Sequence, residues 1–286
     1  MKKFIGIFAA LLLAAAWIQA ADQYRYDESE TIEKTFRFGT AGGVGDLQVD
    51  NIFGSITVIG TNRSDVKMTA RKTIKARTRD RIQKAKNEVR LDITEEDRLI
   101  DIFVDGPFRE KNRRGEQENW NPGYAVHYDF TLEVPKKINL FIKTVTEGDV
   151  SVQNVEGDFE VRNVNGKILI DGITGSGSAH TVNGGVMVNF DSNPKNDCSF
   201  KTINGDLELH FRNNLEADFW LKTFHGEAYT DFDYNKLPVK IEKTEKNNDK
   251  GKYVYRSNHI SGVRIGKGGP EIKMDTLNGD LLIKKR

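Results

Sequence analysis

The sequence predicts an all-β protein, a β-solenoid of stacked coils with an N-terminal β flank, on the strength of three observations. A short sequence motif, which we call the phrase, recurs along the second half of the chain. It consists of an apolar residue followed by Asn-Gly and often by Asp. The glycines of successive copies are nine residues apart at first and twenty-one apart later, and a fixed short period indicates a stacked repeat. Apolar residues alternate on either side of each glycine, which indicates strands with one buried face.

The copies of the phrase predict where the coils turn. Clear copies lie at 164–167, 182–185, 203–206 and 277–280, and looser copies lie at 146–149, 155–158, 173–176 and 224–227. In the nine-residue stretch, Asn precedes Gly at 166 and 184 but not at 157 or 175. Two half-coils of nine residues therefore make one coil of eighteen, with the Asn-Gly copies on one corner. The predicted corner residues are Asn165, Gly166, Asn183, Gly184, Asn204, Gly205, Gly226, Asn278 and Gly279.

A second architecture fits the same phrase. Asn-Gly suits a solenoid corner because both residue types tolerate positive φ, but Asn-Gly between apolar runs is also the strongest short-range signal for a hairpin. The alternative is therefore an antiparallel β meander or sandwich. We favour the solenoid because a meander gives no reason why Asn-Gly copies should alternate with Glu-Gly and Thr-Gly copies.

The first 21 residues have the pattern of a signal peptide. Lys2 and Lys3 precede an apolar run at 4–18, and small residues follow at 20 and 21, which is the order of charge, apolar run and cleavage site in an export signal. The run is short for a membrane span of about 20 residues. No second apolar run follows, so we expect no transmembrane segment in the mature chain. The sequence predicts an exported protein, either periplasmic or at the cell surface.

The mature chain, 22–286, is predicted to be a single domain. We expect flanking strands over 31–135, repeated coils over 136–286 and an insertion at about 235–262, where a polar, charged stretch breaks the pattern. Within the flank the spacing of apolar residues predicts a short helix over 79–88 and a hairpin that turns at 94–97.

A loop is predicted over 105–123, since Gly, Pro and Asn punctuate both of its ends. It carries a basic cluster of Arg109, Lys111, Arg113 and Arg114. Such short charge runs are usually solvated. The functional alternative is a contact with an anionic surface.

Charge and cysteine content exclude some classes of protein. The chain has 43 basic and 42 acidic residues, and removing Lys2 and Lys3 leaves 41 against 42. Because nucleic-acid binders are strongly basic, we expect no nucleic-acid partner. Cys198 is the only cysteine, so it has no partner for an intramolecular disulfide. Its place in the apolar alternation favours a buried structural thiol over a bond between chains.

The sequence predicts no metal and no cofactor. A calcium β-roll would need at least six oxygen ligands, and Asp is missing after the corner glycine at 167, 185 and 227. The histidines outside the corners, His127, His180, His210 and His259, share no zinc-ligand spacing. No catalytic constellation stands out, so we predict no catalytic residues and a protein that is not an enzyme. The alternative is a carbohydrate-active enzyme on a β-helix scaffold.

Stacking the coils brings two sets of polar residues into line. Asn165, Asn183, Asn204 and His225 would form a side-chain ladder on one corner, with Asp after the glycine capping nearby backbone N–H groups. The position four residues before the corner glycine faces outward, because the position before it faces the core. The residues in that position are Arg162, His180, Lys201 and Lys222. They would form a basic column suited to an anionic glycan or another envelope polymer, unless nearby acids such as Glu160 make it an ordinary solvated face.

An apolar stripe is predicted on the opposite sheet. Leu169, Met187 and Tyr229 lie three residues after their corner glycines and face outward, with Glu208 interrupting them. An exposed apolar stripe can mark a partner surface. We instead expect the N-terminal flank or the 235–262 insertion to cover it.

The repeated Val/Ile-Asn-Gly-Asp turns follow a strand that ends in Val-Pro at 134–135, and the chain closes with Gly-Gly-Pro-Glu at 268–271 and Thr-Leu-Asn-Gly-Asp at 276–280. These features resemble the bacterial "putative adhesin" family of exported domains of unknown function, over roughly 40–286. The resemblance implies a β-solenoid fold and an adhesin-like role, and it implies no catalytic residues. The chain departs from the family pattern at 224–226 and at 235–262.

These inferences together predict an exported, non-enzymatic β-repeat protein. It would be an adhesin-like or envelope surface-interaction module that binds a polymer, such as an anionic glycan, or an envelope protein through its strand faces. The alternatives are a polysaccharide-active enzyme on a β-helix scaffold and a purely structural envelope protein.

Overall fold

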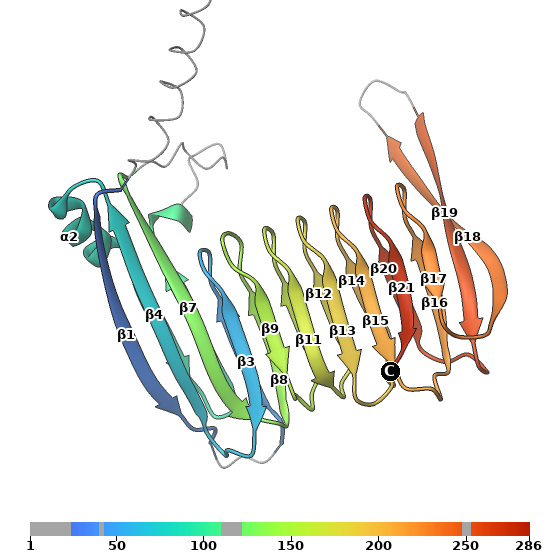
Figure 1. Ribbon diagram of the computed structural model, residues 1–286, viewed down its shortest axis with the longest axis horizontal. Coiled ribbons are helices and arrows are strands. Elements are labelled where there is room, and N and C mark those ends of the chain that lie inside the picture. Colours follow the sequence, from blue (N-terminus) through green and yellow to red (C-terminus); the bar gives the residue numbers. More distant parts are fainter. Residues whose placement is uncertain (1–23, 40–42, 110–121, 248–252) are drawn as a thin grey trace, which may run out of the picture. The chain divides into compact units, whose positions relative to one another are not determined.

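The structure, a computed structural model, describes residues 24–39, 43–109, 122–247 and 253–286. Within these ranges the regular elements are strands apart from one α-helix and one short 3-10 helix, so the predicted all-β class is confirmed (Figure 1). The described residues contain no helix that is both long and apolar enough to cross a membrane. The predicted signal peptide at 1–21 lies outside the described residues, and so do Lys111, Arg113 and Arg114.

The contacts within the chain divide it into two compact units. One consists of Met1–Glu30, Lys72–Arg90 and Asp105–His127, and the other of Thr31–Arg71, Leu91–Val104 and Tyr128–Arg286. The second unit holds all the repeats. The prediction of a single domain over 22–286 stays a prediction.

The first unit contains the helix that the apolar spacing predicts. Helix α2 covers Arg79–Glu88 and buries Ile82 and Ala85. The hydroxyl of Tyr124 donates a hydrogen bond of 2.5 Å to the carboxylate of Glu88. Burial, and then this bond, raise the pKa of Tyr124 above its usual value. The 3-10 helix η1, Pro107–Arg109, opens the segment that is predicted as a loop.

The strands form two sheets, of ten and eleven strands (Figure 1). The first sheet has the order β1 (Tyr26–Phe36), β4 (Val66–Ala76), β7 (Tyr124–Pro135), β3 (Ile56–Thr61), β9 (Val150–Gln153), β11 (Ile168–Ile173), β13 (Val186–Phe190), β15 (Leu207–Phe211), β21 (Leu281–Lys285) and β17 (Ala228–Thr230). The second has the order β18 (Tyr234–Asn247), β19 (Tyr253–Ile265), β16 (Ala217–Lys222), β20 (Glu271–Asp275), β14 (Cys198–Lys201), β12 (Gly177–His180), β10 (Phe159–Arg162), β8 (Ile138–Lys143), β2 (Gly45–Asp50), β6 (Leu99–Asp105) and β5 (Arg90–Glu95). The predicted hairpin is confirmed, because β5 and β6 are neighbours and the backbone N–H of Glu96 donates to the carbonyl of Leu99 at 2.8 Å.

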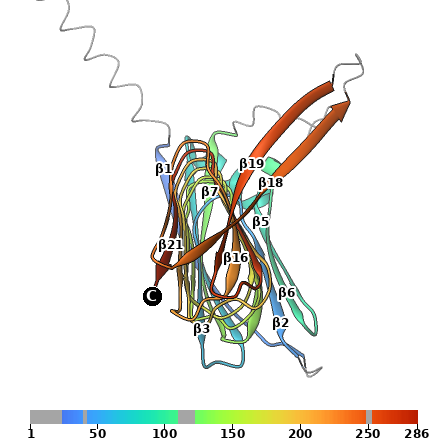
Figure 2. The same cartoon turned by 90° about the vertical axis from the view of Figure 1, so that its right-hand side faces the viewer.

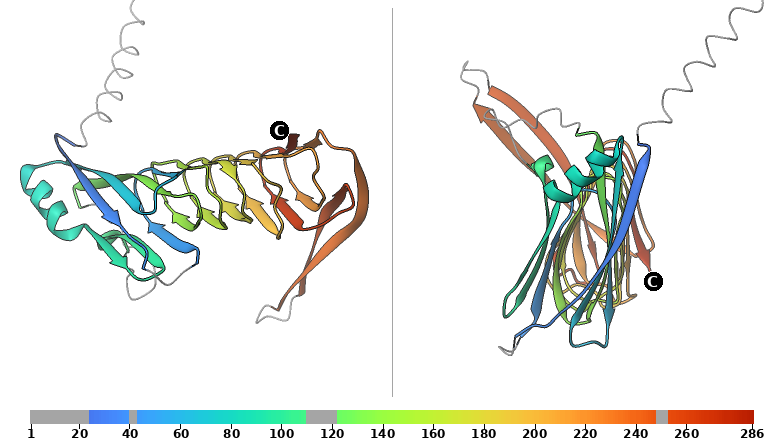
Figure 3. Two further views of the ribbon diagram at one scale, coloured as in Figure 1. Left: turned by 90° about the horizontal axis from the view of Figure 1, so that it is seen from below. Right: turned by 90° about the vertical axis from the view of Figure 1, so that its left-hand side faces the viewer.

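In the repeat region the chain alternates between the two sheets, from β9 in the first to β10 in the second, and so on to β17 (Figure 3). From β9 to β15, each strand pairs in parallel with the strand of the neighbouring repeat in the same sheet. Ile168 pairs with Val150 and with Val186, each eighteen residues distant (168 − 150 and 186 − 168). The predicted eighteen-residue spacing is therefore confirmed. The antiparallel meander is wrong for β9 to β15, whose pairings are parallel.

The insertion at 235–262 corresponds to a hairpin. Strands β18 and β19 pair antiparallel, and β19 also pairs antiparallel with β16 (Figure 2). After the hairpin the chain returns to the stack. Strand β20 lies between β14 and β16, and β21 lies between β15 and β17. The last copy of the phrase is therefore not the last coil in space.

This order corrects the predicted stack, in which the corner at 226 follows the corner at 205 directly. The physical reason is the composition of the two final coils. Leu281 and Ile283 are 0% and 1% exposed between their neighbours, whereas Ala228 in β17 is exposed. Because burying large aliphatic side chains stabilises a fold far more than burying Ala or Thr, the richer strand takes the inner place and β17 takes the edge.

Candidate functional site

The corner residues form the predicted amide ladder. The Nδ2 atom of Asn183 donates to Oδ1 of Asn165, Asn204 donates to Asn183, and Asn278 donates to Asn204, each at 2.7 Å. His225 lies next to Asn278 through a backbone bridge. The prediction that His225 follows Asn204 is wrong, because the last copy of the phrase occupies the place between them. The ladder binds coil to coil through its own donors and acceptors, so it is a structural feature.

Aspartates after the corner glycines accept backbone N–H groups, as predicted, but these groups belong to the neighbouring corner. Oδ1 of Asp206 accepts the backbone N–H of Asp280 at 2.8 Å, and Oδ1 of Asp280 accepts that of Glu227 at 2.9 Å. Each carboxylate thus caps the next corner instead of its own. These oxygens are committed to backbone donors, and the described residues contain no group of three or more His, Cys, Asp or Glu side chains placed to hold a metal ion.

A third ladder, of threonine hydroxyls, was not predicted. Thr202 lies three residues before Gly205 and is 5% exposed. Its hydroxyl donates at 2.8 Å to the carbonyl of Gly184 in the neighbouring corner. Thr181, Thr223 and Thr276 make the same bond to Gly166, Gly279 and Gly205 at 2.9, 2.9 and 3.1 Å. The Thr three residues before the corner glycine recurs in four copies, and Asn163 takes this position before Gly166 and donates to the carbonyl of Gly148 at 2.9 Å. This recurrence is a sequence signal that could have revealed the ladder, because a polar residue at an inward position needs a hydrogen-bond partner.

The basic column is only partly as predicted. On adjacent strands of the second sheet Arg162 pairs with His180, and His180 pairs with Lys201. Lys201 then pairs with Asp275, and Asp275 pairs with Lys222. The returning strand β20 therefore places a carboxylate between Lys201 and Lys222. Lys143 on β8 extends the column at its other end, beside Arg162.

We call Lys143, Arg162, His180 and Lys201 the basic row. Three ion pairs limit the positive charge here. Within the row, Lys143 pairs with Asp50 at 3.1 Å and Arg162 with Glu160 at 2.8 Å, and beyond the row Lys222 pairs with Asp275 at 3.6 Å. Within the described chain no ion pair holds Lys201, which is exposed.

His180 is the half-buried member of the basic row. Its Nε2 atom lies 3.3 Å from the hydroxyl of Ser199. Burial, and then the charges of Lys201 and Arg162, lower the pKa of His180 below its usual value. The ring is therefore neutral at neutral pH, which reduces repulsion between the cations on either side of it.

An exposed apolar ridge runs beside the basic row. It consists of the apolar residue that opens each copy of the phrase. In stack order these residues are Val164, Val182, Ile203, Leu277 and Phe224. Ile203, Leu277 and Phe224 are 44%, 46% and 74% exposed. A shallow groove of about 770 Å³ joins the ridge to Lys201 and Lys222. Alternation from the buried positions predicts that the first residue of the phrase faces outward, so this ridge could have been found in the sequence.

The apolar stripe on the first sheet is exposed. Leu169, Met187 and Tyr229 are 39%, 37% and 47% exposed, so the expectation that other segments cover them is wrong for the described chain. Glu208 pairs with Met187 as predicted, but Leu282 of the returning strand separates Glu208 from Tyr229.

A second groove, of about 520 Å³, carries four carboxylates: Asp158, Glu160, Asp197 and Glu271. Each has a partner already. Asp158 and Asp197 accept the backbone N–H groups of Ser176 and Glu271 at 2.9 and 2.8 Å. Glu160 pairs with Arg162, and Glu271 pairs with Lys273 at 4.0 Å. The arrangement is that of a structural cluster on the outer face of the second sheet.

Cys198 is buried, 3% exposed, as its place in the apolar alternation predicts. Burial raises the pKa of its thiol to about 11. The thiolate is the reactive form of cysteine, so we expect iodoacetamide at about pH 8 to leave the folded protein unlabelled and to label it rapidly in urea. Mass spectrometry before and after unfolding checks this. Rapid labelling of the folded protein would contradict the buried position.

The fold defines a class of protein, an all-β protein whose repeat strands pair in parallel within each of two sheets. The sequence matches no protein-family model and no curated protein. The chain is similar to a solved "putative cell adhesion protein" from Clostridium sporogenes, with 11% identity, 91% of this chain and 100% of that chain covered, and a TM-score of 0.38. It is similar to a "putative adhesin" from Bacteroides fragilis, with 12% identity, 90% and 97% covered and a TM-score of 0.38. It is also similar to a "putative lipid binding protein" from Parabacteroides distasonis, with 14% identity, 91% and 97% covered and a TM-score of 0.26.

Proposed function

We propose that this protein is an exported, non-enzymatic surface-interaction module that binds an anionic polymer along the basic row. The single observation that carries the proposal is the run of Lys143, Arg162, His180 and Lys201 on four adjacent parallel strands. Adjacent strands lie about 4.8 Å apart, which is less than the screening length of about 8 Å at physiological ionic strength. Lys143 and Arg162 are one strand apart, and Lys201 is two strands from Arg162, at about 9.6 Å, with the neutral His180 between them. These three cations therefore face one chain of negative charges.

The apolar ridge supports the same proposal. Exposed apolar side chains that flank cations suit a ligand with both apolar and anionic faces, such as an acidic glycan. The phrase repeats an apolar residue at this outward position, half-buried at Val164 and Val182 and exposed in the other three copies of the ridge. We further infer that the repeats form one β-solenoid with eighteen-residue coils, and that the turn phrase is the mark of the "putative adhesin" family. The parallel pairings support the first inference and the repeated residues support the second.

Charge reversal at Lys201 tests this proposal. We expect Lys201→Glu to weaken retention on polygalacturonate by roughly tenfold, about 1.4 kcal/mol, because Lys201 is the exposed cation of the row that no described residue holds in an ion pair. Lys222→Glu should have a smaller effect, because Asp275 already neutralises Lys222. The measurement is affinity chromatography at rising salt concentration.

The matched control is Lys167→Glu, which makes the same change of charge at an exposed corner position away from the row. Thermal unfolding of all three variants checks that each remains folded. Equal retention of the Lys201 and Lys167 variants would refute the basic row as the binding surface. Absence of any retention by the wild-type protein would instead favour a purely structural envelope protein.

A carbohydrate-active enzyme is the second candidate, and the groove with four carboxylates favours it. Hydrolysis would need an acid and a base that are free to exchange protons, whereas these carboxylates already bind backbone or cationic groups. We therefore place binding ahead of cleavage. Release of reducing ends from polygalacturonate, lost in Glu160→Gln, would reverse that order.

A further inference from the structure

Among the described strands, the first sheet ends at a short strand with one unpaired edge. Strand β17 is its last described strand. The backbone N–H of Leu281 donates to the carbonyl of Glu227, and that of Asp231 donates to the carbonyl of Ile283. Alternate residues of a parallel strand face the same neighbour, so Ala228 and Thr230 direct their N–H and C=O groups away from β21. The described chain places no strand on that side.

The second sheet continues past this point. Strands β19 and β18 extend it beyond β16, the strand whose chain leads into β17. A groove of about 530 Å³ lies in the step between the two sheet ends. Its apolar walls come from both sheets: Leu221, Leu237 and Val263 from the second, Leu281 and Ile283 from the first. At this level the second sheet has strands, but the described part of the first sheet has no strand to face them. One added strand beside β17 would complete the two layers.

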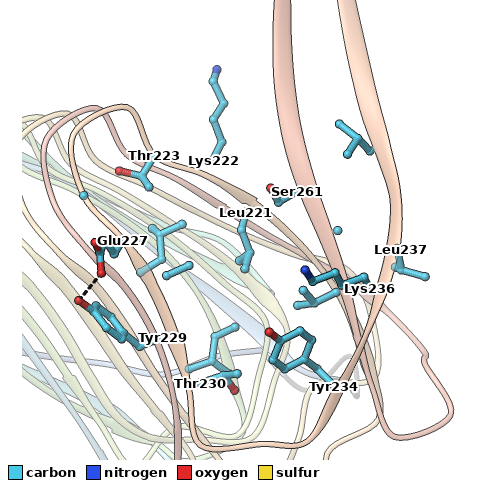
Figure 4. Close-up of a pocket in the computed structure, with 17 residues that line it drawn as sticks. Leu221, Lys222, Thr223, Glu227, Tyr229, Thr230, Tyr234, Lys236, Leu237 and Ser261 are labelled. Carbon is cyan, nitrogen blue, oxygen red and sulfur yellow. Dashed lines mark hydrogen bonds between the residues drawn. The ribbon is translucent and has the colours of Figure 1, made fainter.

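Two polar groups of β18 reach into the groove. Figure 4 shows the ammonium group of Lys236 and the hydroxyl of Tyr234 pointing into it from the hairpin. Lys236 has no ion-pair partner within the described residues. The carboxylate of Glu227, which also lines the groove, is held by the hydroxyl of Tyr229 at 2.8 Å (Figure 4). Counting only the described residues, the groove thus offers apolar walls, a strand edge without a partner and a cation, Lys236, without an ion pair.

We propose that this groove accepts an extended peptide segment of a partner protein, which adds to β17 as a strand. The face of this peptide segment that points into the groove carries apolar side chains on either side of a carboxylate, and that carboxylate contacts Lys236. Main-chain hydrogen bonds to a sheet edge supply affinity, and pockets for alternate side chains supply specificity. The site is separate from the basic row, so the proposal does not depend on polymer binding.

Two other occupants fit less well. A fatty acid or similar amphiphile would fill the apolar walls and meet Lys236, but it would cover the N–H and C=O groups of Ala228 and Thr230 without pairing them. Buried backbone groups without partners are costly. A second copy of the chain, paired edge to edge about Tyr229, would set Glu227 opposite Asp231. Like charges directly opposite each other are destabilising.

The probe is the fluorescein-labelled peptide acetyl-Thr-Val-Thr-Asp-Thr-Val-Thr-amide, followed by fluorescence anisotropy. One face of this peptide, when extended, carries Val, Asp and Val. Two further peptides are N-methylated at alternate residues, one in each of the two registers. We expect the wild-type protein to bind the parent peptide and one of the two methylated peptides with similar affinity. We expect it to bind the other methylated peptide at least about tenfold more weakly than the parent. That difference is the signature of pairing along one edge. Equal binding of both methylated peptides would overturn the proposal.

Two variants test the residues. Ala228→Pro removes an N–H that faces the free edge and leaves the ladder to β21 intact, and we expect at least about tenfold weaker binding. Lys236→Glu should exchange the preference, so that a peptide with Lys in place of Asp binds more tightly than the parent. The tighter binding of the Lys peptide by Lys236→Glu is a gain of affinity, so it tests the proposal even if Ala228→Pro distorts strand β17. The proposal fails if Lys236→Glu does not exchange the preference between the Asp peptide and the Lys peptide. It also fails if dodecanoate displaces the parent peptide while both methylated peptides still bind, because the groove is then an amphiphile site. Concentration-dependent dimerisation that blocks the peptide would likewise overturn it.

Discussion

Gly184→Ala is expected to lower the free energy of unfolding by about 2–6 kcal/mol, from backbone strain and overpacking together. Gly184 has φ = +148°, a value that side chains rarely adopt. A Cβ atom there would lie 2.3 Å from the carbonyl oxygen of Gly166 in the neighbouring corner. Because that oxygen belongs to backbone held by the hydroxyl of Thr181, it has little freedom to move.

The adjacent residue supplies a matched control. A Cβ atom on Gly185 would lie 3.2 Å from the carbonyl of Asp206, a contact that a shift of a few tenths of an ångström relieves. The equivalent positions of other corners already carry side chains, as at Lys167 and Asp206. We therefore expect Gly185→Ala to change stability by less than about 1 kcal/mol. Urea unfolding of the two variants checks this, and equal losses of stability would contradict the role assigned to Gly184.

The local parts of the fold could be predicted because they depend on residues close in the sequence. The alternation between Asn-Gly and Glu-Gly or Thr-Gly copies predicts the eighteen-residue spacing, and the pairing of Ile168 with Val150 and Val186 confirms it. The Asn ladder follows from that spacing. Helix α2 follows from the spacing of Ile82 and Ala85, the two residues it buries.

The order of the final coils could not be predicted from the period. The insertion at 235–262 breaks the repeat, and beyond it sequence order no longer gives stack order. What decides the order is burial. Leu281 and Ile283 gain more from an inner position than Ala228 and Thr230 do. Comparing the residues at these equivalent positions would have indicated which coil lies at the edge.

The error in the basic column follows from that one misplaced coil. With the 226 corner set beside the 205 corner, Lys222 comes next to Lys201 and the basic column runs unbroken. The returning strand puts Asp275 between them, so the strongest run of cations shifts toward Lys143 and Arg162. Finding Lys143 required pairing across β8, which precedes the first clear copy of the phrase and carries no Asn-Gly to set its register.

Phe190→Ala is expected to lower the free energy of unfolding by about 3–5 kcal/mol. Phe190 is 0% exposed, and its ring stacks on that of Phe211 with the centroids 4.9 Å apart. It also meets the ring of Phe200 edge to face at 6.4 Å. Phe190 and Phe211 belong to the first sheet and Phe200 to the second, so these rings are where the two sheets pack together. Removing one ring leaves a cavity that both sheets line. Neither sheet can close the cavity unless a strand shifts relative to its hydrogen-bonded neighbours.

The matched control is Phe224→Ala, which removes the same side chain from a position that is 74% exposed. Little apolar surface is buried there, so we expect a change in the free energy of unfolding within about 0.5 kcal/mol. Phe190→Leu should fall between the two, because Leu keeps part of the volume and all of the apolar character. Urea unfolding at equilibrium measures all three variants. An equal loss of stability in Phe224→Ala and Phe190→Ala would contradict the exposed position of the ridge. It would mean that packing holds the side chain of Phe224, which would then be unavailable to a ligand.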